Sequence, residues 1–290
     1  MECGGKWYVT YPSKADVFTV WNFADLHMGS KACAEDRLRE DVARVKDDPY
    51  ALWVGGGDYA DFIGYTDRRF DPDSVADWVS VADLAKLGQA SIERVRDLFK
   101  PIAGKGLGLL LGNHEKKYAL AKDHEGLHGW LCTELELPDL GYSCLFDLVF
   151  ARNPSARRPR LTRACPPYGE RNSKESASYR FFVHHGAGYA QTPGGKLNRL
   201  SKFMDDFQAD IYMCGHVHDQ VGRRKPQIGA DRDCKRLRAT ERLGVISGSY
   251  LKTYAQGVCT YGEQRGYSPV SLGAAWVAIK PSTGELRAEV

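Results

Sequence analysis

Five short blocks of this 290-residue sequence place carboxylate, amide and imidazole side chains directly after an apolar run. The blocks are Asp25-Leu26-His27, Gly57-Asp58, Gly112-Asn113-His114-Glu115, His184-His185-Gly186 and Gly215-His216-Val217-His218. First-row divalent metals bind imidazole nitrogen together with carboxylate and amide oxygen. Because the blocks offer more ligands of these types than one ion needs, the sequence predicts a site for two metal ions.

The apolar runs before the blocks have the length and the β-branched or aromatic content of short buried strands. We predict strands at residues 17–23, 52–54, 107–111, 179–183 and 210–214. Residues two apart in a strand face the same side, which would let Asp25 and His27 reach one ion. Three glycines before Asp58 allow a close turn, so this carboxylate could bridge two cations. Taken alone, Asp25 could instead cap a helix, and Gly57-Asp58 could be a simple turn.

Taken together and in this order, the blocks resemble the motifs of the calcineurin-like metallophosphoesterases. The family pattern is Asp-x-His, Gly-Asp, Gly-Asn-His-Glu/Asp, a lone His and Gly-His-x-His, and all five parts occur between residues 25 and 218. The resemblance implies an α/β fold, namely a four-layer α/β/β/α sandwich of two mixed sheets flanked by helices. The site would then lie at the carboxyl ends of the strands, where open α/β sheets generally bind ligands.

The resemblance also implies a set of metal ligands. The candidates are Asp25, His27, Asp58, Asn113, His184 or His185, His216 and His218. Asp58 would bridge the ions, one ion would also be held by Asp25, His27 and His218, and the remaining candidates would hold the other. His185 is favoured over His184 because the glycine after it matches the His-Gly form of many family members. Other members favour the first histidine, so both stay candidates.

The chemistry implied by the family is hydrolysis of a phosphoester. A water held between two cations is deprotonated near neutral pH and would be the nucleophile. His114 is the implied catalytic residue, which would protonate the leaving oxygen or stabilise charge on the phosphoryl group. The expected cofactor is a pair of divalent ions. Mn²⁺ is the expected metal, and the ligand types also accept Fe, Zn²⁺, Co²⁺ or Ni²⁺.

Helical spacing of apolar residues predicts the remaining helices. We expect one helix at residues 31–47, one long or two shorter helices across 71–99, and one helix from Gly194 to about Phe207. The apolar runs 245–250 and 275–279 are predicted to be strands that close the far sheet.

A glycine-rich turn begins the helix expected at Gly194. The free N–H groups of such a turn can bind phosphate, and the nearby Lys196 and Arg199 are candidate substrate-binding residues. His124 and His128 lie a helical turn apart, and we expect them to be surface or internally paired side chains rather than ligands.

Length and composition limit the class of protein. Because the ligand blocks span most of the chain, we expect one domain, residues 1–290, with basic surface insertions near 152–178 and 222–242. The net charge of +3 argues against a strongly basic nucleic-acid coat, and eight cysteines without a Cys-x-x-Cys pair argue against a zinc ribbon or a disulfide scaffold. No apolar run has the length of a signal peptide or a membrane helix, so we expect a cytoplasmic protein without membrane association.

The two arginine-rich segments favour a polyanionic substrate such as DNA, RNA or a nucleotide, because phosphate contacts release counterions. The leading hypothesis is therefore a metal-dependent phosphodiesterase or nuclease. The alternative is a phosphomonoesterase for a small metabolite or a phosphoprotein, in which the arginines are only solvated surface. A non-catalytic phosphate-binding module is a third hypothesis, which the intact ligand set disfavours. The sequence does not indicate an oligomeric state.

Overall fold

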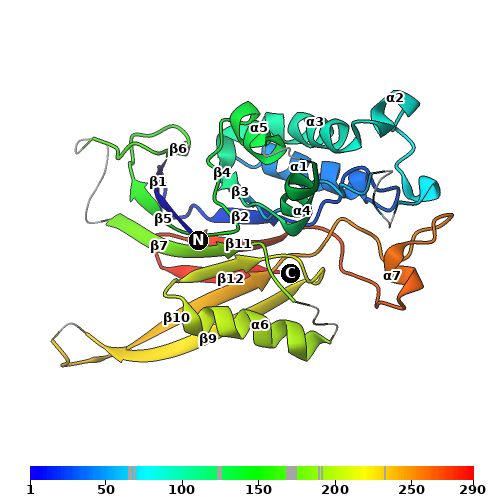
Figure 1. Ribbon diagram of the computed structural model, residues 1–290. Coiled ribbons are helices and arrows are strands. Elements are labelled where there is room, and N and C mark those ends of the chain that lie inside the picture. The colour runs from blue at the N-terminus through cyan, green and yellow to red at the C-terminus, as the bar shows by residue number, and fades with distance from the viewer. Residues whose placement is uncertain are drawn as a thin grey trace.

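Two mixed β-sheets packed face to face occupy the centre of this computed structural model, and helices cover the outer face of each sheet (Figure 1). The chain therefore has the predicted four-layer α/β/β/α arrangement. The residues that the structure describes are 1–64, 67, 70–122, 126–167, 175–188, 190, 192–231 and 233–290.

The larger sheet has seven strands within the described residues. In spatial order they are β6 (Arg160–Thr162), β1 (Glu2–Tyr11), β5 (Ser143–Arg152), β7 (Ser176–His184), β8 (Ile211–Cys214), β10 (Leu237–Ile246) and β9 (Val221–Ala230). Strands β7, β8 and β10 are parallel, and their last residues His184, Cys214 and Ile246 lie side by side. Two predicted ligand blocks follow two of these three strands.

The smaller sheet has five described strands. In spatial order they are β12 (Glu285–Glu289), β11 (Ala275–Lys280), β2 (Phe18–Phe23), β3 (Ala51–Gly55) and β4 (Gly106–Leu109). Strands β2, β3 and β4 are parallel, and Phe23, Gly55 and Leu109 are in register at their carboxyl ends. The other three ligand blocks follow these three strands, so both sheets deliver their blocks from strand ends.

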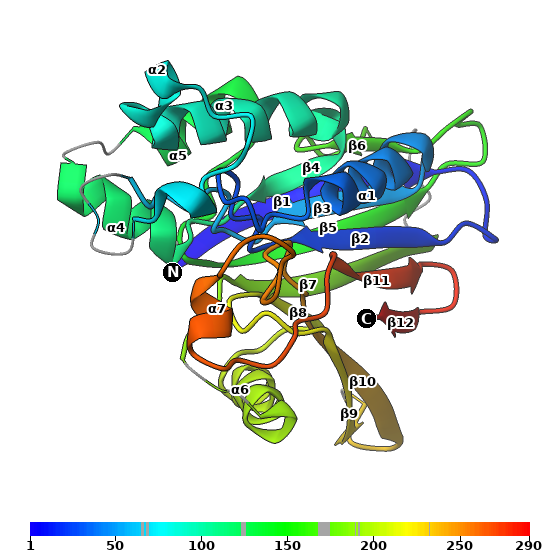
Figure 2. The same ribbon diagram turned by 90° about the vertical axis from the view of Figure 1, so that its right-hand side faces the viewer.

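The helices lie in the two outer layers (Figure 2). The smaller sheet is covered by α1 (Glu35–Asp47), α3 (Leu87–Phe99) and α5 (Leu127–Glu134), and the larger sheet is covered by α6 (Pro193–Asp206). The shorter helical elements are η1 (Pro72–Ser74), α2 (Val81–Leu84), η2 (Lys100–Lys105), α4 (Asn113–Lys122) and α7 (Tyr261–Gln264). In the described part of the chain, no helix combines the length and the apolar character needed to cross a membrane.

Three apolar clusters hold these layers together. The largest lies between the sheets and includes Phe146 and Phe181, whose rings stack with centroids 5.1 Å apart. A second cluster under α1 and α3 includes Trp53, and a third under α6 includes Phe182. Fully burying one such side chain contributes about 1.5–3 kcal/mol to stability. The strand ends that carry the ligand blocks are therefore fixed to a rigid centre.

The structure corrects one prediction about the carboxyl-terminal strands. The runs 245–250 and 275–279 do not close the same sheet, because Val245 lies in β10 of the larger sheet and Val277 lies in β11 of the smaller one. The first strand also ends early, at Ile246. Beyond it the backbone turns toward the first ligand block, where the Tyr250 N–H donates to the Asp25 carbonyl at 2.9 Å.

The first basic segment and the tip of the second lie at the end of the sheets away from the ligand blocks. Strand β5 leads to the segment that begins at Arg152, and this end of β5 pairs with the start of β7, opposite His184. Most of the second segment forms an antiparallel hairpin of β9 and β10, which extends beyond the neighbouring strands (Figure 1). In the first segment, residues 168–174 lie outside the described residues, and residues 160–162 form a short edge strand rather than plain loop.

Candidate metal centre

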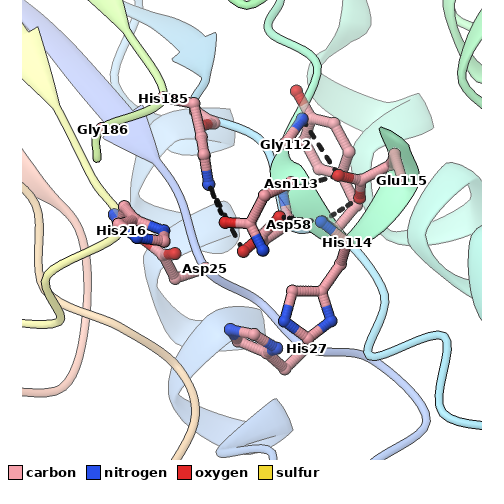
Figure 3. A network of polar contacts seen from close by, with 12 residues as sticks. Asp25, His27, Asp58, Gly112, Asn113, His114, Glu115, His185, Gly186 and His216 are labelled. Carbon is pink, nitrogen blue, oxygen red and sulfur yellow. Dashed lines mark hydrogen bonds and ion pairs between the residues drawn. The ribbon is translucent and has the colours of Figure 1, made fainter. Parts of the chain in front are cut away.

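The loops after five strands converge where the two sheets meet at their carboxyl ends (Figure 3). Hydrogen bonds join the sheets at this edge. The Asn22 side chain donates to the Cys214 carbonyl at 3.1 Å, and the Ser247 hydroxyl donates to the Asn22 carbonyl at 2.6 Å. The His216 N–H donates to Asp25 Oδ2 at 2.7 Å. The ligand blocks of both sheets are therefore held in one place.

Seven of the side chains that come together offer nitrogen or carboxylate ligands in three overlapping groups, each with its ligand atoms within 4.8 Å of one another. The groups are Asp25, Asp58, His185 and His216; Asp25, His27 and His218; and His27, Asp58 and His114. Asn113 joins the first group, because its Oδ1 lies 3.0 Å from His185 Nε2. Asp25 and Asp58 each belong to two groups, so the groups describe adjoining positions rather than separate sites.

The backbone at these residues adopts an uncommon conformation. Eight non-glycine residues among those described have positive φ, and five of them are Asp25, His27, Asp58, His216 and His218. Such conformations cost about 1–3 kcal/mol each and persist where surrounding contacts enforce them. The prediction that alternation along a strand brings Asp25 and His27 to one ion is therefore wrong in its reason. The block lies beyond β2, and left-handed turns at 55° and 50°, rather than strand alternation, aim its two side chains at one place.

Glu115 holds the turn that carries Asp58. This buried carboxylate accepts backbone N–H groups from Asp58 at 3.0 Å, Tyr59 at 2.6 Å and Gly112 at 3.0 Å. The His114 N–H donates to Asp58 Oδ1 at 2.9 Å, which fixes the carboxylate from the other side. Glu115 was part of a sequence motif but had no predicted role. The available sequence signal for this role was the place of Glu115 three residues after Gly112, at the start of a helix.

Asp61 orients two imidazoles and was not singled out from the sequence. Its Oδ1 lies 3.2 Å from His27 Nδ1, and its backbone carbonyl accepts a hydrogen bond from His114 Nδ1 at 2.7 Å. Partners of this kind fix the tautomer and ring direction of a ligating histidine. Asp61 lies in a loop without regular periodicity, so no sequence pattern could have placed it here.

Unsatisfied polar atoms show that the cluster fits divalent cations. Asp25 Oδ1 is buried and has no hydrogen-bond partner among the described residues, although His218 Nε2 lies 3.3 Å away. His27 Nε2 and His218 Nε2 face each other at 3.4 Å. A buried polar atom without a partner costs about 1–3 kcal/mol, which coordination to a cation would offset. Two carboxylates, one amide and several imidazoles are suitable ligands for such an ion.

The charges of the cluster shift its pKa values strongly. Burial favours the neutral form of Asp58, but the imidazoles of His185 and His114 outweigh burial and hold its pKa well below the usual range. Burial lowers the pKa of His185, but Asp58 and Asp25 outweigh burial and raise it to about 9. Without bound metal, the carboxylates are thus ionised and His185 is protonated at neutral pH. A cation binding there would replace that proton.

The sequence match to a family model agrees with this geometry. The model described as calcineurin-like phosphoesterase matches residues 18–220, which is more than half of the chain and includes every residue of the three groups. This chain belongs to the calcineurin-like phosphoesterase family. The predicted family is therefore confirmed. The family and the cluster together support a phosphoester hydrolase with a binuclear divalent metal site.

The solved structures that are similar to this chain include three of low sequence identity. An uncharacterized protein of Streptococcus pneumoniae, a predicted phosphoesterase, is 12% identical with a TM-score of 0.32, over 91% of this chain and 84% of its own. A single mutant of Vps29 from Entamoeba histolytica is 10% identical with a TM-score of 0.36, over 94% and 97%. The NAD nucleotidase of Haemophilus influenzae is 10% identical with a TM-score of 0.35, over 95% and 49%. No curated protein gives a significant match.

The two adjacent histidines of the fourth block have different surroundings in this phosphoesterase. His185 is fully buried, and its Nε2 lies 3.4 Å from Asp58 Oδ2. His184 is the last residue of β7, and its ring packs against Phe203 of α6 with centroids 4.7 Å apart. Its Nδ1 accepts the Gly186 N–H at 2.8 Å. His184 belongs to none of the three groups, because neighbouring residues at a strand end face opposite sides.

The candidate substrate-binding residues lie beside the cluster. Lys196 Nζ is 3.1 Å from Asp219 Oδ2, in an ion pair that adjoins His218 in sequence. The Arg199 guanidinium lies so close to Gly188 that a Cβ there would be 2.5 Å from its Nη2. Lys196 is therefore already ion-paired, whereas Arg199 lies beside Gly188 and forms no ion pair among the described residues.

The two histidines that the sequence analysis set aside are not both described. His124 lies outside the described residues. His128 is buried, and its Nε2 lies 3.1 Å from Asp139 Oδ1. It is internally paired, as predicted.

Proposed function

We propose that this phosphoesterase hydrolyses phosphodiester bonds, in nucleic acid or nucleotides, with two divalent cations bound at the cluster. Asp25, His27 and His218 would hold one cation and Asn113, His185 and His216 the other, with Asp58 contacting both. The observation that carries the proposal is the overlap of the ligand groups, because two carboxylates shared by adjoining positions suit a pair of ions better than one.

Bound cations would activate water for attack and neutralise charge on the phosphoryl oxygens. The contribution of the protein is to fix where this happens. Asp25 and Asp58 stay ionised because neighbouring imidazoles lower the pKa of each despite burial. The three backbone N–H donors to Glu115 keep the Asp58 turn in place. The positions of the metal-binding carboxylates are thus fixed before substrate binds.

His114 is proposed as the proton donor to the leaving oxygen. Its Nδ1–H is taken up by the Asp61 carbonyl, so Nε2 is the nitrogen that can exchange a proton with substrate. Burial lowers its pKa, but Asp58 and Asp61 outweigh burial and raise it above the ordinary value. A protonated Nε2 is the form that a general acid requires.

The pairing of one of the two nearby cations supports a diester rather than a monoester. A phosphomonoester carries up to two negative charges and a phosphodiester carries one. Lys196 is neutralised by Asp219, whereas Arg199 packs against Gly188 and keeps its charge, so these two candidate residues together offer one free positive charge. Both residues are proposed to contact substrate at the rim. A phosphomonoesterase remains the alternative that the experiment below separates.

The experiment compares bis-(p-nitrophenyl) phosphate with p-nitrophenyl phosphate, using protein stripped of metal and reloaded with Mn²⁺, our proposed metal. We expect turnover to favour the diester and to require the metal. In Asp58→Asn, metal content and turnover should fall together. In His114→Gln, metal should be retained while turnover falls by about 10²–10⁴. Asp47→Asn, on the exposed face of α1, is the control.

Each result has a stated meaning. Full turnover in Asp58→Asn would contradict the proposal. Preference for the monoester would support the phosphomonoesterase alternative instead. Elemental analysis of protein purified without chelator tests the metal, and Zn²⁺ or Fe in place of Mn²⁺ would correct its identity while leaving the residue assignments unchanged.

A further inference from the structure

The hairpin of β9 and β10, residues 221–246, concentrates the positive charge of the molecule. It contains eight Lys or Arg residues and three Asp or Glu residues, a net charge of +5, whereas the whole chain has +3. The other 264 residues therefore have a net charge of −2. We call this hairpin the basic arm. One of its arginines, Arg232, lies outside the described residues.

The cations of the basic arm differ between its base and its tip. Near the base, Arg224 pairs with Glu241 at 3.0 Å, and Lys225 pairs with Asp205 of α6. Toward the tip, Lys235, Arg236 and Arg238 are exposed. In the described part of the chain, none of these three has an acidic side-chain partner. The described part of the tip thus offers three cations that form no ion pair with an acidic side chain.

The basic arm has two unlike faces. Residues paired across an antiparallel hairpin point to the same side. Ile228, paired with Ala239, and Leu237, paired with Ala230, therefore share one face, where they are 78% and 83% exposed. Arg238 lies on the opposite face. The arm is a two-stranded ribbon whose first face carries the apolar side chains and the ion-paired Arg224 and Glu241, while the other described strand cations lie on the opposite face.

Basic side chains on the cationic face continue toward the metal centre. Arg242 donates to the Met204 carbonyl of α6 at 2.9 Å, and Arg223 contacts Ser201 one turn earlier in that helix. Arg199 lies nearer the start of the same helix. It contacts Gly188, which is two residues after the fourth ligand block. A line of positive side chains thus runs from the arm along α6 to the cluster.

We propose that the basic arm binds nucleic acid. A two-stranded ribbon fits the major groove of a duplex, and unpaired Lys and Arg side chains at its tip can contact phosphates. The exposed Ile228 and Leu237 are residue types that proteins insert between base steps. A second copy of the chain is disfavoured at this surface because two arms of net charge +5 repel each other. A flat anionic membrane could meet only the tip, whereas Arg223 and Arg242, whose hydrogen-bond partners are neutral, lie further along the ribbon.

The arm and the metal centre lie far apart. Val221 is three residues after His218, and ten strand residues at about 3.3 Å each place the tip roughly 30 Å further on. At about 3.4 Å per base pair, only a nucleic acid of roughly nine base pairs or more could reach both. This length dependence rests on the proposed function. Binding by the arm itself does not.

The experiment measures binding of a labelled duplex of about 20 base pairs by fluorescence anisotropy, in chelator, across a salt series. The test variant combines Lys235→Ser, Arg236→Ser and Arg238→Ser. The control combines Lys46→Ser, Lys86→Ser and Lys100→Ser, which removes three exposed charges from the helical layer. We expect the test variant to bind at least about tenfold more weakly at low salt. Its slope of log affinity against log salt should fall by roughly 3, about 0.9 per lost phosphate contact. The control should change binding less than about twofold.

Three results would overturn the proposal. They are no duplex binding by the unmodified protein at low salt, equal weakening in both triple variants, and no weakening in the test variant. If sedimentation shows a dimer that only Ile228→Ser with Leu237→Ser dissociates, the surface is a contact between copies. If anionic vesicles bind through the arm and duplex does not compete, the ligand is a membrane. Because duplex binding is measured without metal, a failure of the Mn²⁺-loaded protein to hydrolyse the nitrophenyl diester would leave the arm proposal unaffected and would count only against the proposed function.

Discussion

The two ends of the sheets in this molecule are built in opposite ways. At the carboxyl ends of β2, β3, β7 and β8, charged and imidazole side chains are buried, paired and held on strained backbone. At the other end, segments 152–178 and 221–246 have a combined net charge of +10, which leaves −7 for the rest of the chain. Their described cations are mostly solvent-exposed or half-exposed. One end is organised to hold cations, and the other to meet anions.

The contrast indicates which end of the sheets lowers the folding stability of the molecule. Five residues in left-handed conformation at one edge cost several kcal/mol in total, and the close-packed sheets must offset this cost. The exposed arm adds little packing energy, and its Lys and Arg side chains stay hydrated. Substitutions should therefore affect chemistry and folding at the first end, and only ligand affinity at the second.

The largest expected effect separates the neighbouring residues His184 and His185. We expect His185→Ala to lose one metal equivalent and to reduce diester turnover by more than about 100-fold, because it removes a buried nitrogen beside Asp58. His184→Ala removes a ring that packs on Phe203 and should leave metal content unchanged. Metal stoichiometry and turnover of both variants provide the measurement. Equal loss of metal and turnover in both variants would show that the conformation of the strand end, rather than His185 as a ligand, determines metal binding.

A smaller effect is expected at Glu115. In the unmodified protein, three backbone N–H groups donate to the Glu115 carboxylate. Replacement by Gln keeps the shape of the side chain but puts an amide N–H₂, which cannot accept these hydrogen bonds, in place of one carboxylate oxygen. We expect metal affinity to fall about 10–100-fold and the free energy of unfolding to fall by about 1–3 kcal/mol. Metal titration and denaturant unfolding measure these changes. Glu40→Gln on the exposed face of α1 is the matched control, and equal behaviour of the two variants would remove the proposed role of Glu115.

The sequence could reveal the ligand side chains because chemistry restricts their types and the family fixes their order. Strand ends were also predictable, since β2, β3, β4, β7 and β8 are short apolar runs with a polar residue after them. The conformation that aims Asp25 and His27 was not predictable, because positive φ at non-glycine residues is enforced by tertiary contacts. Strand β1 was missed because Lys6 and two glycines interrupt its apolar pattern.

For the basic arm, the sequence indicated the residue types but not their place in the fold. Its arginines were recognised from the sequence as a basic surface insertion, but the direction in which the chain carries them was not predicted. Strand β9 carries the chain away from the cluster, so the cations end at the far side of the sheet. The residues of β9, Val-Gly-Arg-Arg-Lys-Pro-Gln-Ile-Gly-Ala, do not signal a strand, because the period-two apolar pattern of a half-buried strand is absent.

The smallest expected effect concerns the buried His128 and its exposed partner Asp139, a pair that needs a proton rather than a metal. Burial lowers the pKa of His128, but hydrogen bonds to Asp139 and Cys132 outweigh burial and raise it to about 10. A raised pKa in the folded protein stabilises it fully below the unfolded value of about 6.5, and the gain is lost as pH rises toward 10. Asp139→Asn should therefore lower the free energy of unfolding by about 1–2 kcal/mol at pH 6, and by progressively less up to pH 10. Denaturant melts of this variant and of Asp47→Asn across that range test the pair, and a pH-independent difference would show that His128 stays neutral. Such a result would leave the His128–Asp139 contact as a neutral hydrogen bond whose contribution to stability does not depend on pH.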